Sequence, residues 1–153
     1  MSDRTAIRPA TASDAPALAE LSGVLGYPAT PEAFALRLAP LLVSTDNIIL
    51  VAQLDGGEIV GWIHGGERNL LETGPRCEIL GLVVAAESRG RGIGRALVSA
   101  IEEWARKRGF AELAVRSNIT RQDSHPFYYR LGYARVKTQH AYRKSLLTPG
   151  EPA

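Results

Sequence analysis

The stretch that decides the fold of this chain is Leu82-Val83-Val84-Ala85-Ala86-Glu87-Ser88-Arg89-Gly90-Arg91-Gly92-Ile93-Gly94-Arg95-Ala96-Leu97. It begins as an apolar, β-branched run, passes through a glycine- and arginine-rich turn, and continues with the apolar spacing of a helix. A strand, a glycine turn and a helix N-terminus in this order make an anion site, because the first N–H groups of a helix lack intrahelical acceptors. The arginines add positive charge. The stretch therefore predicts a phosphate-binding turn.

Length and composition limit the class of protein. The chain has 153 residues, of which 45% are hydrophobic and 22% charged, as expected for one globular domain. The formal charge of +2 is too small to indicate a polyanionic partner, and no apolar run has the length of a membrane span. The N-terminal residues show no signal-peptide h-region, so we expect no such peptide, and the single cysteine, Cys77, fits a reducing compartment. We expect a cytoplasmic protein without nucleic-acid or membrane partners, and without a metal, because the three histidines lack ligand spacing with Cys77.

Two helices and three strands are predicted before the turn. A strand at 5–8 leads to a helix capped by Ser13 or Asp14, and Thr30 caps a second helix that Pro40 should kink or shorten. The next strands, at 47–54 and 58–64, are joined by Asp-Gly-Gly, a strong hairpin signal. A polar loop at 67–76 then precedes a buried strand at 77–84.

The second half of the chain alternates helices and strands. The helix after the glycine turn should end near Gly109, and a strand at 111–116 completes a crossover that makes it parallel to 77–84. A helix at 124–130 and strands at 133–137 and 141–146 follow, and the tail at 148–153 is predicted to be disordered. We expect Cys77, Trp62 and Trp104 to be core residues.

The turn does not fit two common phosphate-binding patterns. A Walker A loop requires Gly-Lys-Ser/Thr, which is absent, and the dinucleotide pattern requires a glycine where Arg95 stands. The turn does match Arg/Gln-x-x-Gly-x-Gly/Ala on Arg89, Gly92 and Gly94, directly after a strand that contains Val-Val. The alternative is an ordinary glycine-rich turn with solvated arginines.

A second segment, at 124–133, supports one interpretation of the glycine turn. Ser124-His125-Pro126-Phe127-Tyr128-Tyr129-Arg130-Leu131-Gly132-Tyr133 is similar to Ala-x-x-Phe-Tyr-x-x-x-Gly-Phe, with Ser124 in the alanine place and Tyr133 in the last aromatic place. Together with the turn and the strand–helix–strand unit between them, it resembles the GNAT N-acetyltransferase family over nearly the whole chain.

The resemblance implies a fold. It is a single α/β domain over residues 1–147, the acyl-CoA N-acyltransferase fold, with a mixed, mostly antiparallel sheet of about six or seven strands and about four helices. The sheet would splay between two central parallel strands, here 77–84 and 111–116, and the pantetheine arm of the ligand would lie in that gap.

The resemblance also implies acetyl-CoA as co-substrate, without a metal. Backbone groups of one strand would pair with the pantetheine arm, the turn would hold the pyrophosphate, and later residues would add contacts. These cofactor-binding residues are Leu82, Val83, Val84, Arg89, Gly90, Arg91, Gly92, Ile93, Gly94, Arg95, Asn118, Ser124 and Phe127. The family's usual asparagine lies three residues after Asn118, at Arg121, so either residue is a candidate for its role.

Catalysis by such a transferase requires a proton acceptor for the amine and a proton donor for the departing thiolate. Tyr128 matches the family's tyrosine near the thioester sulfur and is the candidate acid; the alternative is a packed aromatic residue. Many relatives carry the base where this chain has Leu80, and Glu78 lies two residues earlier on the same face of the strand. Glu78 is the candidate base, directly or through water, or else a structural carboxylate. Glu72 and His125 are weaker candidates.

The acceptor side would be formed by the first two helices and their connection, with the 67–76 loop opposite. Its residues Tyr27, Glu67, Arg68, Glu72 and Arg76 are a mixed set that selects no substrate. The resemblance implies direct acetyl transfer to a primary amine, most readily that of a small molecule, by a protein that is often a homodimer in this family. The alternatives are a peptide or protein amine as acceptor and a non-catalytic acyl-CoA-binding module. Nucleic-acid binding is disfavoured because no basic stripe with interleaved aromatics accompanies the turn.

Overall fold

The computed structural model describes residues 4–23, 29–116 and 124–150, without the side chains of Ser124 and His125. The chain forms two compact units, Met1–Arg116 and Ser117–Ala153, and each is described by itself. Among the described residues, no helix has both the length and the apolar character needed to cross a bilayer.

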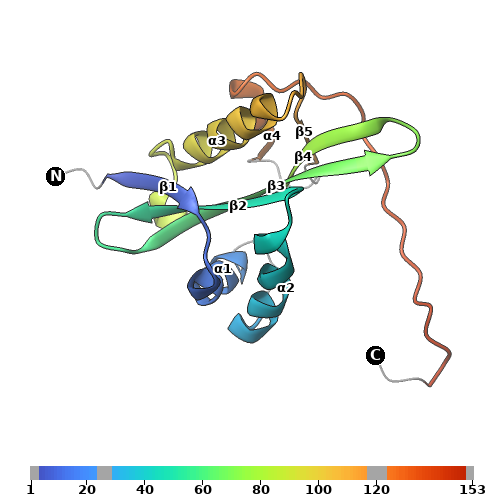
Figure 1. Cartoon of the computed structure of the whole chain (residues 1–153), viewed down its shortest axis with the longest axis horizontal. Coiled ribbons are helices and arrows are strands. Elements are labelled where there is room, and N and C mark those ends of the chain that lie inside the picture. The colour runs from blue at the N-terminus through green and yellow to red at the C-terminus, as the bar shows by residue number, and fades with distance from the viewer. Residues whose placement is uncertain (1–3, 24–28, 117–123, 151–153) are drawn as a thin grey trace. The chain divides into compact units, whose positions relative to one another are not determined.

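The first unit contains a five-stranded sheet of order β1-β2-β3-β4-β5 (Figure 1). The strands β1 to β4 are antiparallel neighbours, whereas β5 runs parallel to β4. Their bounds are Thr5–Pro9 for β1, Asn47–Leu54 for β2, Ile59–Leu70 for β3, Gly74–Val84 for β4 and Ala114–Val115 for β5.

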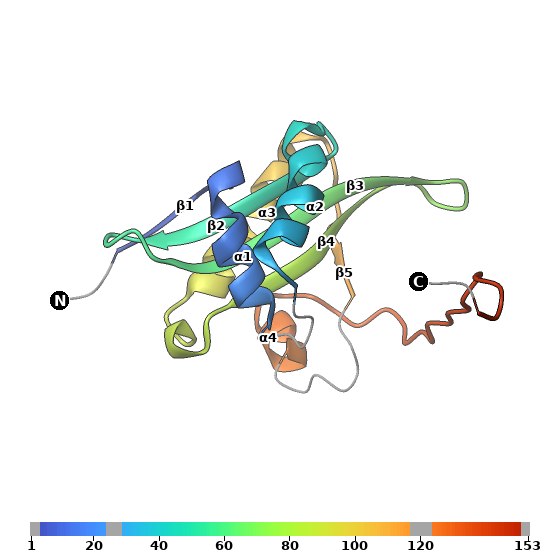
Figure 2. The same ribbon diagram turned by 90° about the horizontal axis from the view of Figure 1, so that it is seen from below.

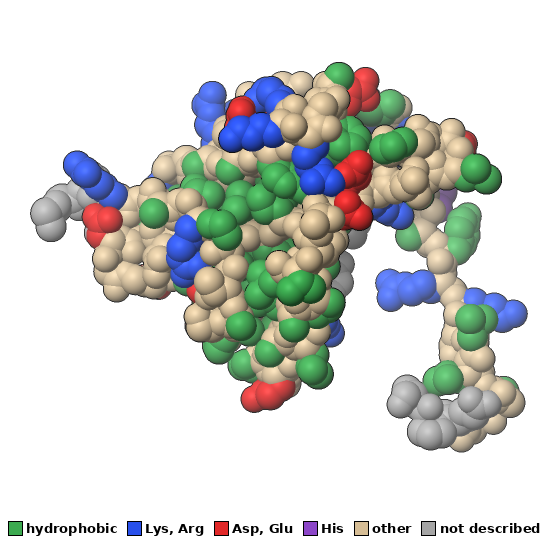
Figure 3. Space-filling model, in the orientation of Figure 1, with side chains coloured by type: hydrophobic (Ala, Val, Ile, Leu, Met, Phe, Trp, Pro, Cys, Tyr) green, Lys and Arg blue, Asp and Glu red, His purple; other side chains and the backbone are tan. Residues whose placement is uncertain are grey.

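Helices cover both faces of this sheet. Figures 1 and 2 show α1 (Ala15–Ser22) and α2 (Pro31–Val43) on one face and α3 (Ile93–Lys107) on the other. The α3 face buries Leu97 and Ile101 completely, while Leu18 of α1 and Leu38 of α2 pack with Ile49 on the opposite face. Figure 3 shows hydrophobic side chains on the surface around α2, the helix whose Leu36 and Val43 are exposed.

Several sequence predictions are confirmed in this unit. Thr30 caps α2, since its Oγ1 accepts a hydrogen bond of 3.1 Å from the Ala33 N–H. Gly109 follows α3 with φ +87, and the Asp-Gly-Gly turn joins β2 to β3. The crossover through α3 makes β4 and β5 parallel. Pro40 does not end α2, because the carbonyl that loses its donor belongs to Leu36, which is exposed and open to water.

The prediction of a loop at 67–76 is wrong. Both strands continue through it, with Glu67 paired to Cys77, Arg68 to Arg76 and Asn69 to Pro75. Its polar residues suggest a loop, but a ladder satisfies their backbone groups equally well while leaving the side chains exposed. The resulting β3–β4 hairpin extends past the helices in both views (Figures 1 and 2).

The described residues form five strands, fewer than the six or seven expected. Residues 133–137 and 141–146 form no strand, and Val136, Tyr142 and Leu146 there are about nine-tenths exposed. A strand requires a neighbour for its backbone groups, and in the described residues this segment joins no ladder. The parallel pair β4–β5 therefore stands at the edge of the described sheet instead of its centre. The helix predicted at 124–130 is present as α4 (Ser124–Arg130) in the second unit.

Candidate active site

The glycine turn before α3 has the backbone geometry that the sequence predicts. Gly92 precedes α3 with φ +79, a conformation that favours glycine, and Gly90 has the same φ. No side chain caps the helix, and its first hydrogen bond joins the Ala96 N–H to the Gly92 carbonyl at 3.0 Å. The preceding N–H groups of Ile93, Gly94 and Arg95 have no acceptor within the helix. The turn therefore presents helix N–H groups without helical acceptors, beside three exposed arginine side chains, those of Arg89, Arg91 and Arg95.

Strand β4 leads into this turn with one open edge. Leu82, Val83 and Val84 pair with β3, opposite Ile63, Trp62 and Gly61. The parallel ladder on the other side of β4 covers only Glu78 and Ile79, so among the described residues no strand pairs with 82–84 on that side. An extended, amide-bearing ligand can add there as a further strand and place a phosphate group at the turn.

Glu78 lies on the face of the sheet that α1 and α2 cover. It pairs with Gly66, the neighbour of Gly65, and a side chain on Gly65 would meet Ile101 of α3. Because alternate residues of a strand point to opposite faces, Gly66 and Glu78 face away from α3. A Cβ added to Gly66 would meet the side chain of Leu80, so Leu80, at the β-bulge of β4, lies on the same face. The relation between Glu78 and Leu80 inferred from the sequence therefore holds.

The Glu78 carboxylate is 2% exposed and lies between two arginines. Its Oε2 is 3.5 Å from Nη1 of Arg68, and its Oε1 is 3.8 Å from Nε of Arg76. The two arginine side chains are 40% and 36% exposed. A buried carboxylate requires such partners. The Glu78 carboxylate therefore lies at the buried end of a cluster of three charged side chains, of which the two arginines reach solvent.

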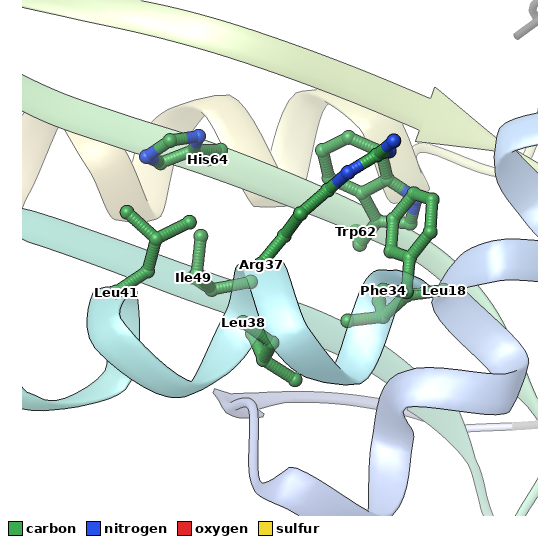
Figure 4. Close-up of a pocket in the computed structure, with 8 residues that line it drawn as sticks. All are labelled: Leu18, Phe34, Arg37, Leu38, Leu41, Ile49, Trp62 and His64. Carbon is green, nitrogen blue, oxygen red and sulfur yellow. The ribbon is translucent and has the colours of Figure 1, made fainter. Parts of the chain in front are cut away.

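A cavity of about 170 Å³ lies on the same face of the sheet, between α2 and β3 (Figure 4). Its walls are mainly apolar and include Phe34, Leu38 and Leu41 of α2. The Arg37 side chain extends from α2 between His64 on one side and Trp62 and Phe34 on the other, as Figure 4 shows.

Two polar groups of β3 line this cavity. His64 Nε2 lies 2.8 Å from Asn47 Oδ1, while Asn47 Nδ2 donates to Ser44 Oγ at 3.0 Å, so the imidazole is the donor to the amide oxygen. Burial lowers the pKa of His64 and favours the neutral ring. The buried Nε1 of Trp62 has no acceptor among the described residues. Trp62 is therefore a wall of the cavity as well as a core residue.

A second cavity, of about 220 Å³, is acidic. It is lined by Asp46, Glu67, Asn69 and Pro75. Arg108 already pairs with both carboxylates, at 3.3 Å from Asp46 and in direct contact with Glu67. Arg108 therefore balances one of the two carboxylate charges, and the cavity keeps one negative charge in excess.

Tyr128 belongs to the second unit. Its ring lies 5.1 Å from that of Phe127 and 5.8 Å from that of Tyr133, both in edge-to-face geometry. Such contacts fix the direction of the ring. Asn118, Arg121 and the Ser124 side chain lie outside the described residues, as does Tyr27.

The sequence analysis missed Arg37 and His64 as site residues. His64 is two positions after Trp62 and four before Arg68 on β3, and this even spacing places all three side chains on one face. That signal was present, but it acquires meaning only once α2 is known to cover the face. Among the described residues, no group of three or more His, Cys, Asp and Glu side chains is arranged to hold a metal.

Comparison with known proteins agrees with this geometry. Residues 16–133 match the Acetyltransferase (GNAT) family. The chain is 34% identical over 119 residues to an aminoalkylphosphonate N-acetyltransferase of Salmonella typhimurium, covering 74% of this chain and 71% of that protein. It is 27% identical over 121 residues to an aminoglycoside N(6')-acetyltransferase of Serratia marcescens, covering 76% and 83% of the two chains.

Solved structures show the same fold. The aminoglycoside 6'-N-acetyltransferase of Acinetobacter baumannii superposes with a TM-score of 0.83 at 22% identity, over 94% of this chain and 99% of that one. The match to the family spans most of the chain, including the glycine turn and Tyr128. The chain therefore belongs to the GNAT family of acetyltransferases.

Proposed function

We propose that this protein transfers the acetyl group of acetyl-CoA directly to the primary amine of a small molecule, with Glu78 as general base and Tyr128 as general acid. The chain belongs to an acetyltransferase family, and acetyl-CoA is its acetyl donor. Both named relatives, the aminoalkylphosphonate and the aminoglycoside enzymes, act on small amines, which favours a small acceptor over a peptide.

One observation carries the proposal. A single strand, β4, has the buried carboxylate of Glu78 near its middle, an open edge at Leu82–Val84 and the anion-binding turn directly after it. The residues present thus fit acetyl-CoA, with the pantetheine along the edge and the pyrophosphate at the N–H groups of Ile93, Gly94 and Arg95. Asn118 or Arg121, Ser124 and Phe127 complete the proposed binding set.

The proton transfers follow from the chemistry of the two side chains. Acetyl-CoA supplies a thioester, whose carbonyl carbon the amine nitrogen attacks as the carbon–sulfur bond breaks. Glu78 accepts the proton that the amine must lose, directly or through a water molecule, and the Tyr128 hydroxyl gives a proton to the departing sulfur. The proposal requires residues 1–147 to act as one domain, since Glu78 and Tyr128 come from the two units.

Replacing Tyr128 with phenylalanine tests the acid. We expect kcat for CoA release to fall about 100-fold or more, as for loss of a general acid, while calorimetry shows unchanged binding of acetyl-CoA. Tyr129→Phe is the matched control, because Tyr129 is the adjacent residue and is 56% exposed. Unchanged CoA release by the Tyr128 variant with every acceptor would rule out its role, and silence of the unaltered protein towards all amines would favour an acyl-CoA-binding module.

Two further features belong to this proposal. The exposed apolar residues Val136, Tyr142 and Leu146 are a candidate contact surface for a homodimer. The single thiol, Cys77, is free and buried, and burial raises its pKa, so it is an unreactive residue of the kind expected in the cytoplasm.

A further inference from the structure

The β3–β4 hairpin carries two arginines that face each other. Arg68 and Arg76 are directly opposite partners in the antiparallel ladder, so their side chains leave the sheet on the same face. Like charges in this position destabilise a sheet. The buried carboxylate of Glu78 offsets part of this repulsion, but one arginine would be enough to pair its charge.

One carboxylate cannot neutralise both arginines. Glu78 is the acidic group that contacts either of them in the described residues, at 3.5 Å and 3.8 Å, which leaves one positive charge in excess. Each guanidinium has five N–H donors, and these side chains are more than a third exposed. Donors of both arginines are thus free to bind an anion from solution.

The cavity on this face adds one positive charge, that of Arg37, and no acid among its lining residues. The cavity between α2 and β3 is lined by apolar residues together with Arg37 and the His64 ring, whose burial favours its neutral form, and none of its lining residues is acidic. The acidic cavity lies elsewhere and is paired with Arg108. A polycationic amine would be repelled by the arginines on the α2 face. An amine that also carries an acidic group would bring a negative charge to these arginines.

Distance sets the size of such an acceptor. Glu78 and Arg76 are two residues apart on one strand, about 7 Å along the chain, and their side chains already approach each other. A molecule with its amine at Glu78 and an acid at the arginines therefore has only a few bonds between the two groups.

We propose that the acceptor is a compact amino acid or aminoalkylphosphonic acid whose acidic group binds to Arg68 and Arg76 while its amine lies at Glu78. This inference rests on the proposed function and specifies its substrate class. A carboxylate presents two coplanar oxygens and a phosphonate presents three. A guanidinium group can bind either of them through two parallel hydrogen bonds.

A matched series of acceptors tests the inference. Propylamine, β-alanine and 2-aminoethylphosphonate share a primary amine and differ in the acid, and kanamycin serves as the polycation. We expect kcat/KM for CoA release to be about 10- to 100-fold higher with one or both acids than with propylamine, as for a charge-assisted hydrogen bond. The two acidic compounds distinguish carboxylate from phosphonate as the preferred group.

Variants assign the preference to the arginines. Arg68→Gln and Arg76→Gln should each raise KM for the acidic acceptors by about 10-fold more than KM for propylamine, since any effect on the neighbouring Glu78 falls on all acceptors alike. Arg76→Glu should reverse the order of acid and polycation. Arg106→Gln is the matched control, because Arg106 is an exposed arginine of α3. Thermal unfolding verifies that each variant is folded.

Binding separates this inference from the proposed function. Calorimetric titration of each acceptor into the protein with CoA measures recognition without turnover. Binding of acids that depends on Arg68 and Arg76, without any CoA release, would support the inference and contradict the proposed function. CoA release with equal or better use of propylamine or kanamycin, or an equal loss with all acceptors in the arginine variants, would overturn the inference and leave the proposed function standing.

Discussion

Asp14 shows at the scale of a residue how this fold stabilises a buried charge. Its carboxylate, 6% exposed, receives two bonds of 2.9 Å from the Arg8 guanidinium and one of 2.7 Å from the Thr11 N–H. The hydrogen bonds from Arg8 hold the pKa of Asp14 below its usual range. A carboxyl with a lowered pKa stabilises the folded state above its unfolded pKa, and that stability is lost as the pH falls through the folded value.

Asp14→Asn should therefore lower the free energy of unfolding by about 2 kcal/mol at neutral pH. The difference from the unaltered protein should shrink below about pH 4, where the carboxyl of the unfolded chain is protonated. Urea unfolding at pH 7 and at pH 3 measures both. Glu20→Gln, at an exposed position of α1, is the control, and an equal loss at the two pH values would contradict the electrostatic explanation.

Glu78 and Arg68 differ in how far the sequence reveals them. The alternation of a buried strand places Glu78 near the proposed chemistry, because neighbours two apart share a face. Arg68 stands in a polar segment that reads as a loop, and only the register of β3 against β4 places it opposite Arg76. Local pattern identifies the first residue, whereas pairing between distant residues identifies the second.

At the scale of an element, the start of α3 depends on glycine at position 92. An L-residue with φ near +79 costs about 1 to 2 kcal/mol, although nothing within 4 Å would obstruct the added Cβ. Gly92→Ala should lower the free energy of unfolding by that amount and weaken acetyl-CoA binding, because the N–H groups at the turn would shift. Urea unfolding and calorimetry measure the two effects. Gly56→Ala, at an unobstructed glycine without positive φ, should change neither; equal behaviour of the two variants would contradict this role.

Elements with local signals agree with the sequence prediction. The Thr30 cap, the Gly109 terminus and the Asp-Gly-Gly hairpin each depend on residues only a few positions apart. The hairpin at 67–76 and the segment after Tyr133 have no such signal. Whether they form strands is determined by the neighbour that each finds, which is a tertiary property.

At the scale of the molecule, the segment after Tyr133 predicts self-association. Light scattering should give a mass of twice 16.5 kDa. Val136→Asp with Leu146→Asp should yield monomers, because both side chains are about nine-tenths exposed in the single chain and association would bury them. Lys144→Gln, on the same exposed segment, is the control. A monomeric mass at every concentration would contradict the dimer.

The sequence by itself determined the donor half of this protein. The glycine turn, the helix after it and the aromatic segment at 124–133 identify the family and acetyl-CoA, because a phosphate cradle is made of consecutive backbone groups that local sequence encodes. The tertiary structure decided the acceptor half. The pairing of β3 with β4 sets Arg68 opposite Arg76 beside Glu78, and the packing of α2 on β3 places Arg37 near His64. These residues come from distant parts of the chain, so the charge that they present together exists only in the folded molecule.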